Sequence, residues 1–216
     1  MVGDAYESII VMAEAGGGEL EVRGPELLLR YAREDDAPAL FALASDPEVT
    51  QFFSWGPYTD ESEAAAYVRS LTRKRADGER LELLIVHPTE GVIGVTGLSE
   101  FSLRDRRAVV GTWHGRKWWG TGANRQSKAL VLALAFRGLG LERLTAWCGS
   151  DNVRSQKALE RLGFVHEGVL RRWHYHHGEP RDVISYSMLR EEWDRGELAR
   201  EPVEIAGEVP VQFKPL

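Results

Sequence analysis

The stretch "GRKWWGTGANRQSK", residues 115–128, decides how the chain around it is interpreted. It holds three glycines, four basic side chains and no acid, although the formal charge of the 216-residue chain is −6. The residues before it, "VVGTWHG", are typical of a strand, and "NRQSKALVLALAF" is typical of a helix that begins near Ala123. Free backbone N–H groups and the helix dipole therefore converge on the loop that contains Gly120 and Gly122. A pyrophosphate group fits such a loop.

Two other phosphate-binding motifs do not fit this stretch. A nucleotide P-loop needs a lysine directly after its second glycine, but Thr121 follows Gly120. A dinucleotide-binding fingerprint needs a third glycine where Arg125 stands. Positive charge around the loop comes from four side chains: Arg116, Lys117, Arg125 and Lys128.

Hydrophobic periodicity and turn residues predict one α+β domain. Strands are expected at residues 27–31, 80–87, 91–101, 106–115, 143–148, 164–178 and 182–189. Helices are expected at residues 36–45, 60–77, 123–140 and 151–163, with a short helix or turn at 46–55. Thr59 is the expected N-cap of the second helix, and Gly178 lies in the turn of the final hairpin. This order predicts a single sheet, with an antiparallel meander at its centre and helices on its faces.

Length and composition restrict the class of protein. A chain of 216 residues with 43% hydrophobic content is enough for one packed domain. Its negative charge argues against a general nucleic-acid binder, because phosphate neutralisation needs a basic face. Cys148 is the single cysteine, which excludes an intramolecular disulfide and a cysteine-based zinc site and makes a cytoplasmic location the expected one. Acids flank the apolar residues near the N-terminus, unlike in a secretory signal, and the apolar run 129–136 is too short for a bilayer, so no membrane partner is expected.

Several segments of the sequence resemble those of a known family. "KWWGTGAN" resembles the acyl-coenzyme A loop of the GNAT superfamily of N-acetyltransferases. Downstream, "RLTAWC", "NVRSQKALERLGF", "EGVLR" and "GEPRDVISYSMLREEW" resemble the RimJ/RimL-type branch, which is related to the ribosomal-protein N-terminal acetyltransferases. The match runs in order from about Leu27 to Trp193. It divides the chain into an N-terminal extension (1–25), a GNAT domain (26–195) and a C-terminal tail (196–216) in which we find no recognisable pattern.

The resemblance implies a fold and a co-substrate. The fold is the single-domain GNAT acyl-CoA N-acyltransferase fold, a mixed and mostly antiparallel sheet with helices on both faces. It splays between its fourth and fifth strands, here "VVGTWHG" and "RLTAWC", and the pantetheine arm of acetyl-CoA lies in the split. The implied cofactor contacts are Thr112, Trp113, His114, Lys117, Gly120, Thr121, Gly122, Ala123, Asn124 and Asn152. Lys117 departs from the family's usual Gln or Arg, and a lysine lacks the planar fork of an arginine.

The family's usual acid is missing from this sequence. Many GNAT members carry a tyrosine where this chain has Leu159. Ser155, three residues after Asn152, stands where the RimL-type enzymes carry a serine that is proposed to help the departing thiolate. We therefore expect Ser155 to be catalytic and Asn152 to hold the local backbone. The alternative is that both residues only cap the helix.

The histidines of "RRWHYHHG" supply the candidate base. His174 falls where the RimL-type enzymes carry a putative glutamate base, and an imidazole titrates in the range that this role needs. Strand alternation places His174 and His176 on one face and Trp173 and Tyr175 on the other. The alternatives are an exposed hairpin histidine and a metal site. We expect no metal, because no third ligand stands at a suitable spacing.

The acceptor is an amine, and the sequence leaves its identity open. Phe53 and Trp55, between the early helices, are expected to line the acceptor pocket. The leading hypothesis is direct acetyl transfer, in a ternary complex, to the N-terminal α-amine of a protein or peptide. A small amine (an amino acid, polyamine or antibiotic) and a non-catalytic CoA-binding module are the alternatives. The resemblance also makes a homodimer plausible.

Overall fold

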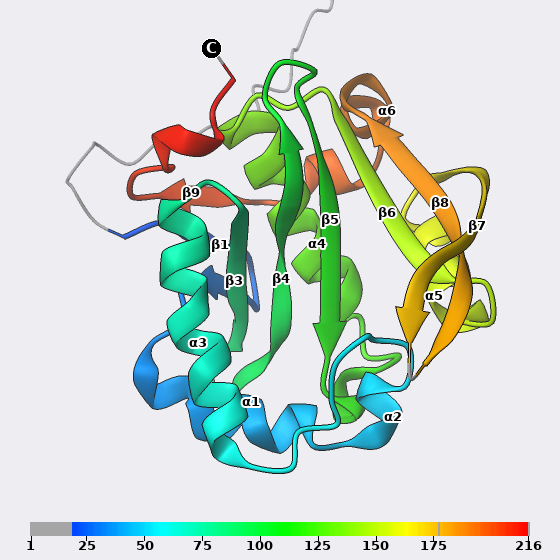
Figure 1. The fold of residues 1–216 in the computed structure, drawn as a ribbon. Helices are drawn as coiled ribbons and strands as arrows, with labels where there is room; N and C mark the ends of the chain where they lie inside the picture. Colours follow the sequence, from blue (N-terminus) through cyan, green and yellow to red (C-terminus); the bar gives the residue numbers. More distant parts are fainter. Residues whose placement is uncertain (1–18, 177, 216) are drawn as a thin grey trace, which may run out of the picture.

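The computed structural model, which describes residues 19–176 and 178–215, contains a nine-stranded sheet flanked by helices (Figure 1). The strands are β1 (Glu21–Arg23), β2 (Leu28–Arg30), β3 (Arg80–His87), β4 (Gly91–Ser102), β5 (Arg107–His114), β6 (Arg143–Gly149), β7 (Val165–His176), β8 (Glu179–Leu189) and β9 (Glu204–Ala206). The α-helices are α1 (Ala37–Ala44), α2 (Pro47–Thr50), α3 (Glu61–Ala76), α4 (Ala123–Ala133), α5 (Val153–Arg161) and α6 (Arg190–Arg195). The strand order is β7-β8-β6-β5-β4-β3-β2-β1-β9. Among the described strands, β5 and β6 form the parallel pair and the other neighbours are antiparallel.

This architecture confirms the predicted fold class. The meander β3-β4-β5 occupies the middle of the sheet, as the three apolar segments predict. The helix before it differs in one detail, because its N-cap is Asp60 rather than Thr59. The Asp60 carboxylate accepts from the Ser62 N–H, and Glu63 accepts in return from the Asp60 N–H, which forms a capping box.

Two hydrophobic cores lie on opposite faces of the sheet. The larger core, on the α4 face, packs α4 against the alternating residues Ala108 and Val110 of β5. The smaller core, on the α1/α3 face, packs those two helices against Leu84 of β3 and Val95 of β4. Figure 1 shows α3 in front of β3 and α4 behind β4 and β5. The two faces thus carry different side chains of the same strands, as the period of two requires.

The end of the chain packs on the sheet. β9 pairs with β1 at the edge of the sheet, and Phe213 is fully buried with its ring centroid 4.6 Å from that of Phe101. The sequence did not predict β1 or β9, since three residues are too few for a periodic pattern. These contacts extend the packed unit past residues 26–195 on both sides. Residues 1–18, most of the predicted N-terminal extension, lie outside the described residues.

The final hairpin departs from simple alternation. Its register shifts between His166 and Gly168 and again between Leu170 and His174, and Arg172 has φ 55°. Such bulges add residues to one strand and change which face a side chain takes. Beyond the second shift, His174 and His176 stack and are half-buried while Trp173 and Tyr175 are exposed, in agreement with the predicted alternation. The rings of both Trp173 and His174 contact Trp147 of β6. The predicted turn residue His177 lies outside the described residues.

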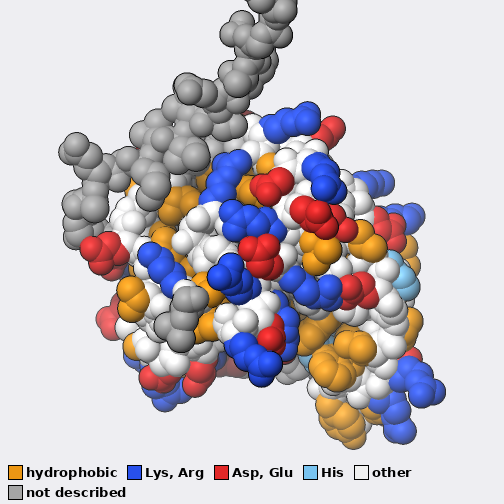
Figure 2. All heavy atoms as spheres, turned by 90° about the horizontal axis from the view of Figure 1, so that it is seen from above, with side chains coloured by type: hydrophobic (Ala, Val, Ile, Leu, Met, Phe, Trp, Pro, Cys, Tyr) orange, Lys and Arg blue, Asp and Glu red, His pale blue; other side chains and the backbone are white. Residues whose placement is uncertain are grey.

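The surface carries both signs of charge. Figure 2 shows basic and acidic side chains interspersed over the described part of the face it views. Among the described helices, none is long and apolar enough to span a membrane.

A buried polar cluster lies between the end of β5 and α4. His114 ends β5 and shares a 3.1 Å hydrogen bond with Ser127 of α4. The neighbouring Lys128 is 4% exposed, and burial lowers its pKa from 10.5 to about 7. Burial, together with the charge of Lys128, lowers the pKa of His114 to about 3. Protonation of the Lys128 amine at this buried position therefore destabilises the folded protein.

This cluster predicts a stability that depends on pH. Between the folded pKa of about 7 and the unfolded value of 10.5, the unfolded chain binds more protons at Lys128, so the free energy of unfolding rises with pH in that window. Lys128→Met should therefore stabilise the protein by about 1–4 kcal/mol near pH 6.5, and by less near pH ~9.5. Urea unfolding at both pH values measures this, with the exposed Lys157→Met as control. Equal destabilisation by Lys128→Met at both pH values would contradict the assignment.

Candidate active site

The sheet opens between β5 and β6. The two strands pair over three residues, from Arg107 with Arg143 to Val109 with Thr145. Beyond Thr145, β6 continues to pair with β8, whereas the described residues 110–114 have no strand partner on their β6 side. Figure 1 shows the two strands diverging toward the end of β5. This opening is the splay that the family resemblance implies between "VVGTWHG" and "RLTAWC", and it leaves backbone N–H and C=O groups available along one edge of β5.

The glycine loop lies at the wide end of the opening. Gly120 and Gly122 have φ values of 76° and 97°, a region that L side chains rarely adopt. A Cβ at either position would meet no atom within 4 Å, so the space in front of the loop is open. The Thr121 hydroxyl donates to Trp118 O at 2.9 Å and accepts weakly from the Ala123 N–H. The remaining N–H groups of the first turn of α4 have no helical acceptor and point toward an incoming anion.

The basic side chains around the loop do not point freely into this space. Their ion pairs join Arg116 with Asp46 and Glu48, Lys117 with Glu90, and Arg125 with Glu197 and Glu201. Lys117, the expected cofactor contact, thus has a carboxylate partner already. Exposed pairs of this kind contribute little to stability and can exchange partners. Attraction for a pyrophosphate therefore rests mainly on the backbone amides and the helix terminus.

An aromatic–arginine pair crosses the opening. The Trp119 indole N–H donates to the His114 carbonyl at 3.1 Å, and the Arg154 guanidinium of α5 lies 3.3 Å from the centre of the Trp119 ring. The sequence did not single out Arg154, because a basic residue in the first turn of a helix carries no distinctive signal. A pantetheine amide that pairs with His114 would compete with the indole for the same carbonyl.

Asn152 and Ser155 meet at the start of α5. The Asn152 side chain caps the helix and accepts from the Ser155 N–H at 3.1 Å. The Ser155 side chain lies beside Cys148 of β6, whose pKa is raised to about 11 by burial although the bond with Ser155 opposes that shift. Leu159 is 5% exposed and belongs to the core. This geometry is compatible with both interpretations of Asn152 and Ser155, the catalytic one and the capping one. The Ser155 side chain lies beside Cys148 of β6, one of the two strands that form the opening.

His174 occupies a different wall. Ala146 and Cys148 of β6 face the α4 core, so Trp147 between them faces the α1/α3 side. The His174 ring lies 6.0 Å from Trp147 and 5.5 Å from His176. Among the described residues, its ring neighbours are therefore aromatic rings rather than Ser155. The two candidate catalytic side chains are not brought into contact.

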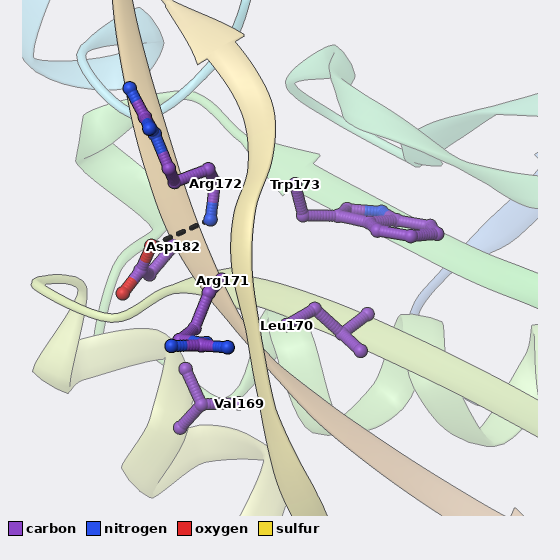
Figure 3. Close-up of a pocket in the computed structure, with 6 residues that line it drawn as sticks. All are labelled: Val169, Leu170, Arg171, Arg172, Trp173 and Asp182. Atoms are coloured by element: carbon purple, nitrogen blue, oxygen red, sulfur yellow. Dashed lines mark hydrogen bonds between the residues drawn. The ribbon is translucent and has the colours of Figure 1, made fainter.

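A shallow hollow of about 660 Å³ lies along this hairpin (Figure 3). Figure 3 shows Leu170 and Trp173 on one side of β7 and Val169 and Arg171 on the other. The backbone N–H of Arg172 donates to Asp182 at 2.7 Å, which fixes the bulge. The hollow lies along the hairpin itself rather than at the glycine loop.

An aromatic wall borders the α1/α3 side of the opening. We define it by Phe53, Trp55, Tyr58 and Trp113. Phe53 and Trp55 stack with centroids 5.0 Å apart, and Trp55 lies 5.5 Å from both Tyr58 and Trp113. Trp113 belongs to β5, so Trp55 packs directly against that strand and Phe53 stacks on the Trp55 ring. The sequence analysis did not single out Tyr58.

The described residues contain no cluster of potential metal ligands. Within residues 19–176 and 178–215, no three His, Cys, Asp or Glu side chains come close enough together to hold a metal ion.

Comparison with known proteins gives consistent matches. Residues 26–165 match the model of the acetyltransferase (GNAT) domain family. The uncharacterized N-acetyltransferase p20 of Bacillus licheniformis is 32% identical over 168 residues, which is 77% of this chain and 94% of p20. The uncharacterized N-acetyltransferase YoaA of Bacillus subtilis is 29% identical over 165 residues, which is 76% of this chain and 93% of YoaA.

A solved structure with a bound cofactor is also similar. RimL, a ribosomal L7/L12 alpha-N-protein acetyltransferase in complex with coenzyme A, is 25% identical with a TM-score of 0.69, covering 76% of this chain and 94% of RimL. This likeness is consistent with the RimJ/RimL-type branch. Since the family model covers most of the chain and the splayed sheet and glycine loop are both present, the chain belongs to the GNAT family and is an acetyl-CoA-dependent N-acetyltransferase.

Proposed function

We propose that this enzyme acetylates the N-terminal α-amine of a protein or peptide by direct transfer in a ternary complex. The observation that carries the proposal is Gly111 of β5, which is exposed and whose missing Cβ would meet no atom within 4 Å. The α1/α3 face is therefore open beside the cofactor strand, and a chain end can reach it. The resemblance to RimL, named as an alpha-N-protein acetyltransferase, supports the same acceptor class.

The proposed cofactor site combines the edge of β5 with the glycine loop. Thr112, Trp113 and His114 supply backbone groups for pantetheine, and Trp119 releases the His114 carbonyl when they do so. The pyrophosphate lies against the loop, held by backbone groups and side chains of Lys117, Gly120, Thr121, Gly122, Ala123 and Asn124. Asn152 orders the facing end of α5. Acetyl-CoA supplies the activated thioester.

The transfer needs a neutral amine and a proton for the leaving thiolate. An α-amine has a pKa near ~8, so the neutral form is accessible at neutral pH with modest help from a base. In the proposed reaction the amine nitrogen bonds to the thioester carbon, the carbon–sulfur bond breaks, and the amine loses a proton. His174 takes that proton directly or through water. The Ser155 hydroxyl donates a hydrogen bond to the departing sulfur, and the thiolate then takes a proton from solvent.

The cytoplasmic location and the homodimer stay predictions. Apolar side chains on the edge strand β7 favour a second copy of the chain as partner: Val165, Val169, Trp173 and Tyr175 are exposed.

The activity is tested by isotope-labelled acetyl transfer from acetyl-CoA to two pools, one of peptides with free N-termini and one of small amines, read by mass spectrometry. Label on peptide N-termini is the expected result, because the acceptor side is open. Label on small amines alone would contradict the proposed acceptor, and binding of acetyl-CoA without label in either pool would favour a CoA-binding module.

Gly122→Ala should weaken acetyl-CoA binding by about tenfold or more, because a methyl group would hold the anion away from amides that make charge-assisted hydrogen bonds. Isothermal titration measures this. Gly140→Ala is the matched control, since Gly140 also has positive φ (70°) and open space around its Cβ position but lies at the far end of the helix. Both variants should lose about 1 kcal/mol of stability. Equal cofactor affinity in the two variants would remove the loop from the site.

Ser155→Ala should lower kcat by about 100-fold, the usual lower range for a positioned acid, and leave the acetyl-CoA Kd unchanged. The helix cap survives in this variant because it uses the backbone N–H of residue 155. Steady-state kinetics and titration separate the two effects, with the exposed Ser150→Ala as control. An unchanged kcat would leave Ser155 with its role in the helix cap alone.

A further inference from the structure

Glu82 faces the open side of the cofactor strand. In the sheet register, Glu82 of β3 lies opposite Gly97 of β4, and Gly97 lies opposite Gly111 of β5. The neighbouring row on the same face consists of Leu84, Val95 and Trp113, which belong to the α1/α3 core or pack against it. The carboxylate therefore lies on the α1/α3 face, at the end of a row whose other two positions lack side chains.

The close approach of β3 to β4 fixes the surroundings of Glu82. A Cβ at position 97 would lie 2.5 Å from Leu81 O, 2.6 Å from Glu82 Cα and 2.8 Å from Glu82 Cγ, so only glycine fits there. The strand spacing of about 4.8 Å puts the Glu82 backbone roughly two strands from the open position at Gly111, on the same face of the sheet. The Glu82 side chain is 17% exposed, so its carboxylate remains accessible to a ligand.

The same position faces the reacting end of the cofactor. The opening is wide at the glycine loop and closes at the pair Val109–Thr145. A pantetheine arm that enters from the loop and follows β5 brings its thioester toward the closed end, beside Val110 and Gly111. This step rests on the proposed function.

Two neighbouring side chains orient the Glu82 carboxylate. The Tyr67 hydroxyl of α3 donates to Glu82 Oε2 at 3.4 Å, and Arg80 lies 3.5 Å from Oε1. Burial, followed by the charge of Glu82, raises the pKa of Tyr67 well above its ordinary value, so Tyr67 stays a donor. Tyr67 packs against the same hydrophobic core cluster as Tyr58 and Trp113 of the aromatic wall. Glu82 also contributes to the raised pKa of Tyr58, behind burial and Glu63.

We propose that Glu82 and the aromatic wall bind the ammonium form of the acceptor amine. A carboxylate beside aromatic faces is the environment that attracts a primary ammonium group. The same negative charge disfavours an acceptor with a carboxylate next to its amine. The class of acceptor is therefore a peptide N-terminus or a diamine, and a free α-amino acid is rejected. Glu82 is therefore an acceptor-binding residue. The bound ammonium group loses its proton in a later step, to the catalytic base.

The test measures binding rather than turnover. Wild-type enzyme saturated with CoA is titrated with a tetrapeptide amide that has a free N-terminus, and with its N-acetylated twin. Tryptophan fluorescence reports binding, because Trp55 and Trp113 belong to the aromatic wall. The free peptide should bind about tenfold or more tightly than the twin, the value of a charge-assisted hydrogen bond. Glu82→Gln should bind both peptides equally.

Two further variants distinguish the effect of the Glu82 charge on peptide binding from the effects of lost space and of lost stability. Glu79→Gln removes an exposed carboxylate from the same end of β3 and should keep the preference of the wild type. Gly111→Val fills the open position, where no neighbour opposes a Cβ, and should weaken binding of the free peptide without loss of stability.

The outcomes distinguish this proposal from the proposed function. A preference for the free N-terminus that survives in Glu82→Gln overturns the ammonium site, and so does the absence of any preference in the wild type. Titration with CoA and the labelled acetyl assay are read separately on the same preparations. Intact CoA binding and peptide acetylation with no role for Glu82 would leave the proposed function standing alone.

Discussion

The early end of strand pairing between β5 and β6 is the constraint on which the rest of the site depends. Three paired residues hold the two halves of the sheet together, and the next five residues of β5 have no strand partner on the β6 side, although the His114 carbonyl accepts from the Trp119 indole. Unpaired backbone inside a protein is costly unless a partner satisfies it. The opening is sustained because each strand has another neighbour, β4 on one side and β8 on the other. The ligand edge of β5 is thus held open by pairing elsewhere in the sheet.

Glycine contributes to this site in two distinct ways. At Gly120 and Gly122 the backbone adopts positive φ, and the absence of Cβ leaves the amides accessible. At Gly111 the missing side chain leaves open space on the α1/α3 face, whereas at Gly97 the backbone of β3 occupies the place that a Cβ would take. Gly120 and Gly122 lie where we propose that the pyrophosphate binds, and Gly111 lies where we propose that the acceptor approaches. In this proposal one residue type shapes both ends of the reaction path.

Local signals predicted most of the fold and the cofactor loop, because periodicity, caps and glycines act over a few residues. The features that were missed depend on long-range register. The row of Glu82, Gly97 and Gly111 exists only once three strands are aligned, and nothing in the separate segments fixes that alignment. The two register shifts that precede His174 in β7 were likewise not predicted, because they depend on the pairing with β8. The contact between Trp119 and Arg154 joins a loop to a helix across the opening, which no local pattern encodes.

The pairing of β1 with β9 has a consequence for folding order. The two strands are separated by almost the whole described chain, so their contact carries a large loop-closure cost and has high contact order. During synthesis β1 can pair with β2, but its other edge stays without a partner until the last segment is made. The middle of the sheet can form first around the β3-β4-β5 meander, whose contacts are local. Completion of the sheet edge then becomes a late step, and a nascent chain exposes a strand edge until that step occurs.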